Sequence, residues 1–143
     1  MPGLKEIHTS LEVGFTDGSL PERFIRYRGQ ASRSVGNVPE LPYEDAQFEV
    51  VMMSGDAVSR KSVKEAHRVL RPEGCLFFTV PEKTNRQTGF SLPEIYSVVR
   101  EGFNIIAVER PAWWRFGWSG RTITICAQKK NWRALTNTYR PYV

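Results

Sequence analysis

The hydrophobic and polar positions divide the chain into short elements that glycine and proline separate. Two almost wholly apolar runs, "FEVVMMS" (48–54) and "CLFFTV" (75–80), predict strands that are covered on both faces. Between them, residues 57–70 carry apolar side chains near helical spacing, and Pro72 and Gly74 are expected to end this helix. A strand, a helix and a strand in this order predict a parallel pair with a right-handed crossover.

Weaker elements flank this central unit on both sides. Residues 10–15 predict a strand, 21–28 one or two helical turns, and 31–37 a weak strand. After the unit, residues 91–102 predict a helix, with Ser91 as its N-cap. These elements extend the alternation of strands and helices toward both ends of the chain.

The chain closes with two predicted strands, residues 103–110 and 121–129. The loop between them is too short for a crossover helix, so they should pair antiparallel. We therefore expect an α/β fold with a sheet of about six strands, mostly parallel, in which the final strand runs against the others. The 143 residues suggest one domain, residues 1–130, followed by a basic C-terminal tail, residues 131–143.

The composition is that of a globular protein, with no apolar run long enough to span a membrane and no secretion signal. Cys75 and Cys126 each lie in an apolar, strand-like run. This placement favours buried free thiols, and a cytoplasmic setting is consistent with them. No metal-ligand spacing involves the cysteines or the two histidines, His8 and His67. His67 lies on the predicted helix one turn after Val63, so it is expected as a boundary residue and not as a base.

The net charge of +5 is unevenly distributed, because no acidic residue follows Glu109. The same C-terminal stretch contains all four tryptophans: Trp113, Trp114, Trp118 and Trp132. Arginine and tryptophan together could hold a phosphate backbone and stack bases, which would suit RNA or another polyanion. The alternative is a solvated basic tail with aromatic packing at the end of the sheet.

Residues 36–51, "GNVPELPYEDAQFEVV", and 63–82, "VKEAHRVLRPEGCLFFTVPE", carry the most specific motif. Their pattern and spacing resemble the class I S-adenosylmethionine-dependent methyltransferases of the methyltransferase type 11 kind. The matching positions are Leu41, Pro42, Tyr43, Asp45, Phe48, Val51, Glu65, Arg68, Val69, Leu70, Pro72 and Gly74. The resemblance covers about residues 10–130 and implies a Rossmann-like sheet with an antiparallel C-terminal hairpin. In this pattern Glu65 and Arg68 anchor a helix to neighbouring loops and have no chemical role.

The same resemblance gives a meaning to "EVGFTDG" at the end of the first predicted strand. In the family this strand ends in an acidic residue and a glycine-rich loop that approaches S-adenosylmethionine. The corresponding positions here are Glu12, Gly14, Thr16 and Gly18. The β-branched Thr16 stands where the family has glycine, so it should cost cofactor affinity through steric bulk and a restricted φ.

Four further positions correspond to the cofactor and substrate sites of the family. Asn37 and Val38 stand where the adenine is read, although Asn37 could instead make a turn after Gly36. Ser54 and Asp56 follow the strand at 48–54, at a position that lines the cofactor and the substrate. Asp56 could face the site or cap the following helix.

The segment 19–40 is too short for everything that the family usually places there. A second strand of the family ends in an acidic residue that holds both ribose hydroxyls. We infer that one strand–helix unit, including this ribose-binding strand, is missing. Glu22 is an acid in the gap but is poorly placed to substitute.

Two functions of different classes follow from these observations. The first is a methyltransferase-like domain with weakened or lost S-adenosylmethionine binding that acts as a binding or scaffold module. The alternative is an active methyltransferase that acts on an unknown small molecule or RNA, with no catalytic side chain evident because positioning supplies much of the rate. Its expected substrate-binding residues are Asp56, Trp113, Trp114, Arg115 and Trp118. The sheet edge left by the missing strand should be covered, either by a second copy or by a protein partner.

Overall fold

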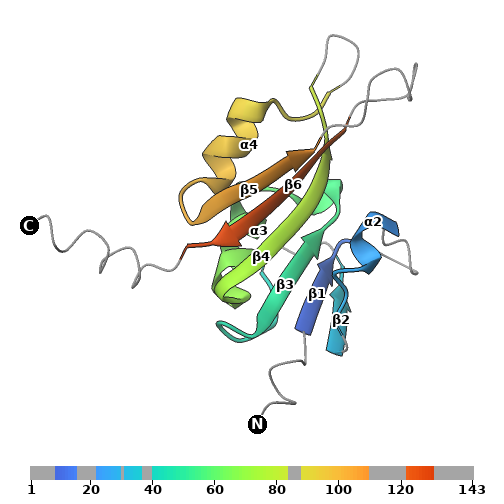
Figure 1. Cartoon of the computed structure of the whole chain (residues 1–143), viewed down its shortest axis with the longest axis vertical. Coiled ribbons are helices and arrows are strands. Elements are labelled where there is room, and N and C mark those ends of the chain that lie inside the picture. The colour runs from blue at the N-terminus through green and yellow to red at the C-terminus, as the bar shows by residue number, and fades with distance from the viewer. Residues whose placement is uncertain are drawn as a thin grey trace, which may run out of the picture.

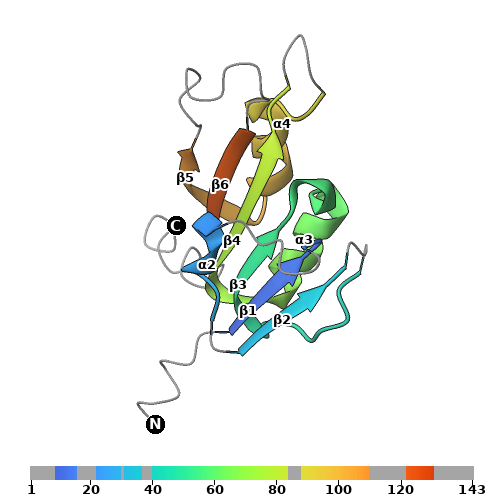
Figure 2. The ribbon, with the colours of Figure 1, turned by 90° about the vertical axis from the view of Figure 1, so that its right-hand side faces the viewer.

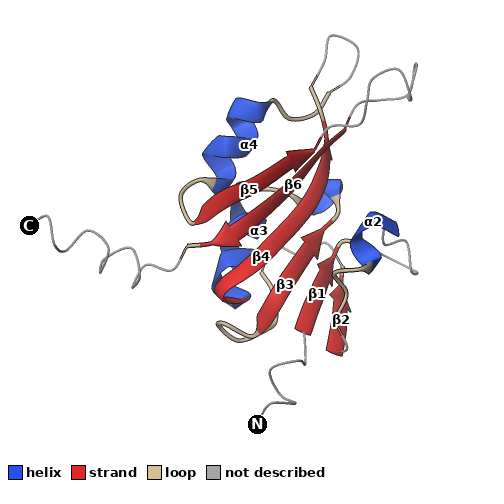
Figure 3. Cartoon of the chain, in the orientation of Figure 1, coloured by secondary structure: helices blue, strands red, loops and turns tan. Residues whose placement is uncertain are grey.

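The structure is a computed structural model, and it describes residues 9–15, 22–29, 31–36, 40–83, 88–109 and 122–130. The elements are β1 (Thr9–Val13), α2 (Glu22–Ile25), β2 (Ala31–Val35), β3 (Phe48–Met53), a 3-10 turn η1 (Gly55–Ala57), α3 (Arg60–Val69), β4 (Leu70–Pro81), α4 (Leu92–Val99), β5 (Phe103–Glu109) and β6 (Thr122–Lys129). Figures 1 and 3 show them in one twisted sheet with helices against it. No helix in the described ranges is long and apolar enough to cross a membrane.

The six strands are ordered β2-β1-β3-β4-β6-β5. The pairs β1–β2, β1–β3 and β3–β4 are parallel, whereas β6 is antiparallel to both β4 and β5. This confirms the predicted parallel strand–helix–strand unit and the antiparallel C-terminal hairpin. It also confirms that the last strand runs against the others.

The two faces of the sheet are covered unequally. In Figure 2, α3 and α4 lie on one side of the sheet, and the short α2 lies on the other. The side chains under α3 and α4 belong to one large apolar core that includes Val51, Val63 and Val99. The α2 side holds a smaller cluster of Phe24, Val50, Met52 and Phe77. The apolar run of β3 is therefore explained, since its alternate side chains enter both cores.

Aromatic packing holds the short helix α2 against its face of the sheet. The ring of Tyr27 stacks on that of Phe77, with centroids 4.0 Å apart and planes 24° apart. Phe24 is fully buried and packs edgewise with Phe15 at 6.2 Å. A helix of one turn has almost no stability of its own, so these contacts fix its position.

One helix start differs from the sequence prediction, and one agrees with it. The N-cap of α3 is Ser59, whose side chain accepts a hydrogen bond from the Ser62 amide, so Asp56 does not cap this helix. Asp56 lies instead in η1 and is exposed. Ser91 caps α4 as predicted, accepting from the Glu94 amide.

The strand β4 begins directly after α3, five residues before the predicted start at residue 75. Leu70 already pairs with Phe48, and the register then shifts so that Val50 faces Cys75. The intervening residues form an irregularity in which Glu73 has a φ of 69°. The helix ends at Val69, before Pro72 and Gly74 as expected, but these two residues lie in a bulge of β4, where a side chain on Gly74 would come within 3.0 Å of the Glu49 carbonyl oxygen.

The strand β2 occupies one edge of the sheet and pairs directly with β1. Its residues are exposed except for Val35, which is half-buried. The sheet thus has six strands in the described ranges, in agreement with the predicted number. The short strand β2 lies against β1 at the edge of this sheet.

Cys75 and Cys126 are free thiols, but both are partly exposed, so their expected full burial is wrong. They lie on the thinly covered α2 face of the sheet, beside Phe77. A hydrogen bond between the two thiols, followed by burial, raises the pKa of Cys126. Cys126 should therefore be a poor nucleophile near neutral pH.

The arginine of the specific motif clamps the loop before β3 onto α3. Arg68 donates to the carbonyl oxygens of Leu41 (2.9 Å) and Tyr43 (2.8 Å). It also pairs with Asp45 at 2.9 Å and with Glu65 at 3.0 Å. Glu65 in turn accepts from the Leu41 amide at 3.0 Å. The anchoring function that the motif implies is thus visible as a network of hydrogen bonds.

This network predicts an acid-sensitive contribution of Glu65 to stability. The hydrogen bond from Arg68 lowers the pKa of Glu65 below its ordinary value of 4.5. The contribution is therefore complete above pH 4.5 and is lost as the pH falls through the lowered pKa. We expect Glu65→Gln to reduce the free energy of unfolding by about 1 to 2 kcal/mol at pH 7, measured by urea denaturation.

The difference between Glu65→Gln and the parent chain should shrink as the pH falls from 4.5 through the lowered pKa of Glu65, where the folded chain takes up the proton. Glu40→Gln is the matched control, because Glu40 is exposed and has no ion pair in the described part of the chain. A stability difference that does not change with pH would contradict the ionic origin of the clamp.

Candidate functional site

The candidate site lies at the carboxyl ends of β1 and β3, which are neighbours in the sheet. Val13 and Met53 are register partners at these ends, and Gly14 and Ser54 follow them directly. In open α/β sheets, ligands bind at the carboxyl ends of the parallel strands. The predicted cofactor residues Glu12, Gly14 and Ser54 are brought together here.

Glu12 is buried within β1, on the α2 side of the sheet, with an exposure of 3%. Its Oε2 accepts a hydrogen bond from Arg28 Nε at 2.6 Å, and its Oε1 accepts one from Arg28 Nη2 at 2.9 Å. Ser34 Oγ donates to Oε1 at 3.1 Å. The bidentate pairing with Glu12 also raises the pKa of Arg28. Both carboxylate oxygens are thus engaged by groups of the chain itself.

The segment that carries Arg28 is itself hydrogen-bonded to the sheet. The Gly29 amide donates to Ser10 Oγ at 3.0 Å, and Ser32 Oγ donates to the Gly29 carbonyl at 2.7 Å. The hydroxyls of Ser10 and Ser32 also lie within 2.9 Å of each other. These bonds connect the turn before β2 to β1, and they position Arg28 over Glu12.

Gly14 adopts a φ of +83°, a conformation that favours glycine. A Cβ at this position would lie 2.3 Å from Ser54 Oγ and 3.1 Å from the Ala57 Cβ. The Gly14 amide donates to the Val35 carbonyl at 2.9 Å, which extends the pairing of β1 with β2. The glycine is therefore required by this turn, and its N–H is already bonded within the chain.

Ser54 closes the other side of the turn. Its amide donates to the Val13 carbonyl at 2.9 Å, and its side chain fills the space above Gly14. Asp56 is two residues further on, exposed, within η1. Asp56 is thus near this edge of the sheet, and its suggested contact with a substrate stays a prediction.

The other predicted site residues lie outside the described ranges. They are Thr16, Gly18, Asn37 and Val38 for the cofactor, and Trp113, Trp114, Arg115 and Trp118 for the substrate. The basic C-terminal tail, 131–143, lies outside them as well. Among the described residues, no group of three or more His, Cys, Asp or Glu could hold a metal ion.

Arg28 and Ser34 are the site residues that sequence reasoning missed. A signal existed, because a carboxylate within an apolar strand needs a cationic or hydrogen-bonding partner. The basic residues of the short gap after Gly18 were the nearest candidates in sequence. Arg28 reaches Glu12 because β2 lies beside β1. The sequence pattern did not predict that pairing, so it could not identify which basic residue would be the partner.

The comparisons with known proteins concern the fold. No protein-family profile matches the chain, and no curated protein matches it in sequence. A solved S-adenosylmethionine-dependent methyltransferase from Methanosarcina mazei superposes with a TM-score of 0.62 at 15% identity, covering 91% of this chain and 98% of that one.

Two further solved structures are similar at comparable levels. One is the 1,6-didemethyltoxoflavin-N1-methyltransferase of Burkholderia thailandensis with its substrate and S-adenosylhomocysteine bound (TM-score 0.60, 16% identity, 91% and 74% coverage). The other belongs to a Haloferax volcanii complex that contains the Trm112 methyltransferase activator (0.65, 15%, 88% and 84%). The chain therefore has the class I methyltransferase fold, and the predicted α/β fold class is confirmed.

Proposed function

We propose that this chain is a methyltransferase-fold binding module that binds S-adenosylmethionine weakly or not at all. The observation that carries the proposal is the engagement of Glu12 by Arg28 and Ser34. A ligand that needed the Glu12 carboxylate would have to displace charge-assisted hydrogen bonds, and it would leave the Arg28 guanidinium without its partner.

The sheet topology supports the same proposal. The edge strand β2 stands next to β1 and ends in Val35, followed by Gly36, so the described end of this strand carries no acidic residue that could hold a ribose. Loss of a charged ribose clamp would lower affinity by a few kcal/mol, on the order of 100-fold. Thr16 in place of a loop glycine would weaken binding further.

An active methyltransferase is the second candidate function. Gly14 favours it, because a glycine with positive φ still follows the first strand, as a cofactor loop requires. A related fold with S-adenosylhomocysteine bound also supports it. A chain of this kind would act by positioning its acceptor against the methyl group, and it would need few catalytic side chains.

Titration with S-adenosylhomocysteine separates these two candidates. We expect no saturable heat in calorimetry up to about 1 mM ligand, because Glu12 is engaged and the ribose clamp is lacking. The Arg28→Gln variant, in which Glu12 loses its ion pair, is titrated beside the parent chain. Lys61→Gln is the control, because it also removes one positive charge but at an exposed site elsewhere. A dissociation constant below about 100 μM for the parent chain would contradict the binding-module proposal.

We also propose that the β2 edge pairs with a strand of another protein chain. Val35 accepts from the Gly14 amide, so the backbone groups of Val35 and Arg33 face β1. Those of Ser32 and Ser34 therefore face outward, and within the described ranges β2 pairs only with β1. Such an exposed edge is a template for strand addition. A second copy of this chain is the first partner to test, and the activator complex of a similar fold supports a protein partner in general.

Ser32→Pro tests this edge directly, since proline removes the outward N–H of residue 32 and leaves the β1 side unchanged. In light scattering at high micromolar concentration, we expect the parent chain to be a dimer. The Ser32→Pro variant should be a monomer under the same conditions. Ser32→Ala is the matched control, because it removes only the hydroxyl bonds to Ser10 and Gly29. A parent chain that stays monomeric, or a dimer that persists in Ser32→Pro, would contradict pairing through this edge with a second copy.

A further inference from the structure

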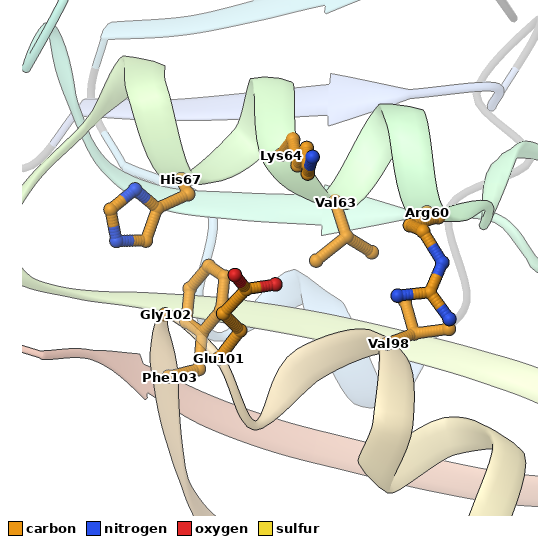
Figure 4. Close-up of a pocket in the computed structure, with 8 residues that line it drawn as sticks. All are labelled: Arg60, Val63, Lys64, His67, Val98, Glu101, Gly102 and Phe103. Carbon is orange, nitrogen blue, oxygen red and sulfur yellow. The ribbon is translucent and has the colours of Figure 1, made fainter.

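A cavity of about 210 Å³ lies between α3 and the turn that leads from α4 into β5. Figure 4 shows it from the side, with α3 above and the α4–β5 turn below. Its apolar wall is formed by Val63, Val98 and Phe103. The cavity is on the helix-covered face of the sheet, whereas the candidate site is at the carboxyl ends of β1 and β3. It is therefore separate from the residues that the proposed function uses.

One end of the cavity is formed by His67, whose Nε2 is buried and has no hydrogen-bond partner in the described part of the chain. The ring is held edgewise against Phe103, at 5.3 Å and 87°. Gly102 permits this position, because a Cβ there would lie 2.5 Å from the His67 Cδ2. Burial, and then the charge of Lys129, lower the pKa of His67 and outweigh the opposite effect of the Gly102 backbone, so the imidazole is neutral at pH 7. An unpaired buried ring nitrogen is costly unless a ligand bonds to it.

Three charged side chains line the opening, and none has an ion pair or hydrogen bond within the described ranges. They are Arg60, Lys64 and Glu101. Arg60 and Lys64 are one helical turn apart, and like charges at this spacing repel each other. In Figure 4 the carboxylate of Glu101 points up into the space below Val63. The cavity thus offers positive and negative groups over an apolar wall.

We propose that this cavity binds a free aromatic α-amino acid with a hydrogen-bonding tip on its ring, of the tyrosine type. Arg60 binds the carboxylate, with Lys64 adding to the positive potential, and Glu101 binds the ammonium group. The ring packs against the apolar wall, and the phenol hydroxyl bonds to His67 Nε2, which pairs with a hydroxyl in either tautomer.

The spacing along α3 fits this arrangement. Figure 4 shows Arg60 and His67 at the two ends of the row, with Val63 between them. Seven residues of α-helix separate their Cα atoms by about 10 Å along the axis. An extended aromatic amino acid reaches across this span once the Arg60 side chain folds over the opening. A simple anion would leave Glu101 unpaired, and a simple cation would leave Arg60 unpaired.

Calorimetry on the full chain with L-tyrosine and three analogues tests the proposal. We expect L-tyrosine to bind with a dissociation constant below about 1 mM. L-phenylalanine, which lacks the hydroxyl, should bind about fivefold more weakly. Tyramine lacks the carboxylate and 4-hydroxyphenylpropionate lacks the ammonium group, and each should lose about tenfold or more. Absence of a saturable response to L-tyrosine, or equal binding of all four compounds, would overturn the proposal.

Variants place the binding at this cavity. Arg60→Gln and Glu101→Gln are exposed substitutions, and each should weaken L-tyrosine binding about tenfold without unfolding the chain. Lys61→Gln removes a charge from the same helix outside the cavity, so its affinity should equal that of the parent. Binding that is the same in Arg60→Gln, Glu101→Gln and the parent would show that the amino acid binds elsewhere. Because none of these residues contacts Glu12 or Gly14, the S-adenosylhomocysteine result is independent of this one.

Discussion

The ion pair between Glu12 and Arg28 is the interaction on which the first half of the molecule depends. Glu12 is a carboxylate inside a buried strand, and a buried charge is tolerated only when it is paired and hydrogen-bonded. Arg28 reaches it because the turn before β2 is tied to β1 through Ser10 and Gly29. One local arrangement thus includes the position of β2, the packing of α2 against the sheet and the turn at Gly14. A position that the methyltransferase pattern assigns to a cofactor loop is here linked to the internal structure of the sheet.

The second half of the molecule retains the complete architecture that its motif implies. Arg68 and Glu65 clamp the loop before β3, and the unit β3–α3–β4 continues into the antiparallel β6. In the described ranges, the face of the sheet under α3 and α4 has a large apolar core, whereas the opposite face has α2 over a small cluster. Within the described ranges, the exposed β2 edge and the cavity beside His67 are the places where we propose contacts with other molecules.

Much of this fold was predictable because local patterns and packing agree. Apolar runs identified β3 and the core of β4, and serine identified the start of α4. The motif spacing identified the Arg68 clamp. The start of β4 was not predictable, because Pro72 and Gly74 are typical of a helix end but here shape a bulge that depends on pairing with β3. The Ser59 cap was hidden among the several polar residues before α3.

The site was less predictable than the fold. The glycine pattern placed a loop after the first strand, and the structure shows Gly14 there with a positive φ, beside Ser54. The pattern did not show that Arg28 and Ser34 would engage Glu12, because that depends on which strand lies beside β1. Side-chain partners across neighbouring strands follow from sheet order, and sheet order is a long-range property that periodicity does not record.

The direct test of this interpretation is a double-mutant cycle on Glu12 and Arg28. Glu12→Gln, Arg28→Gln and the double variant would be compared with the parent by urea unfolding at pH 7. We expect a coupling free energy of about 2 kcal/mol, reduced from the value of a fully buried pair because the Arg28 side chain is 41% exposed. A coupling near zero would show that Glu12 does not depend on Arg28. Its carboxylate would then be free for a ligand, and the reduced-site interpretation would be wrong.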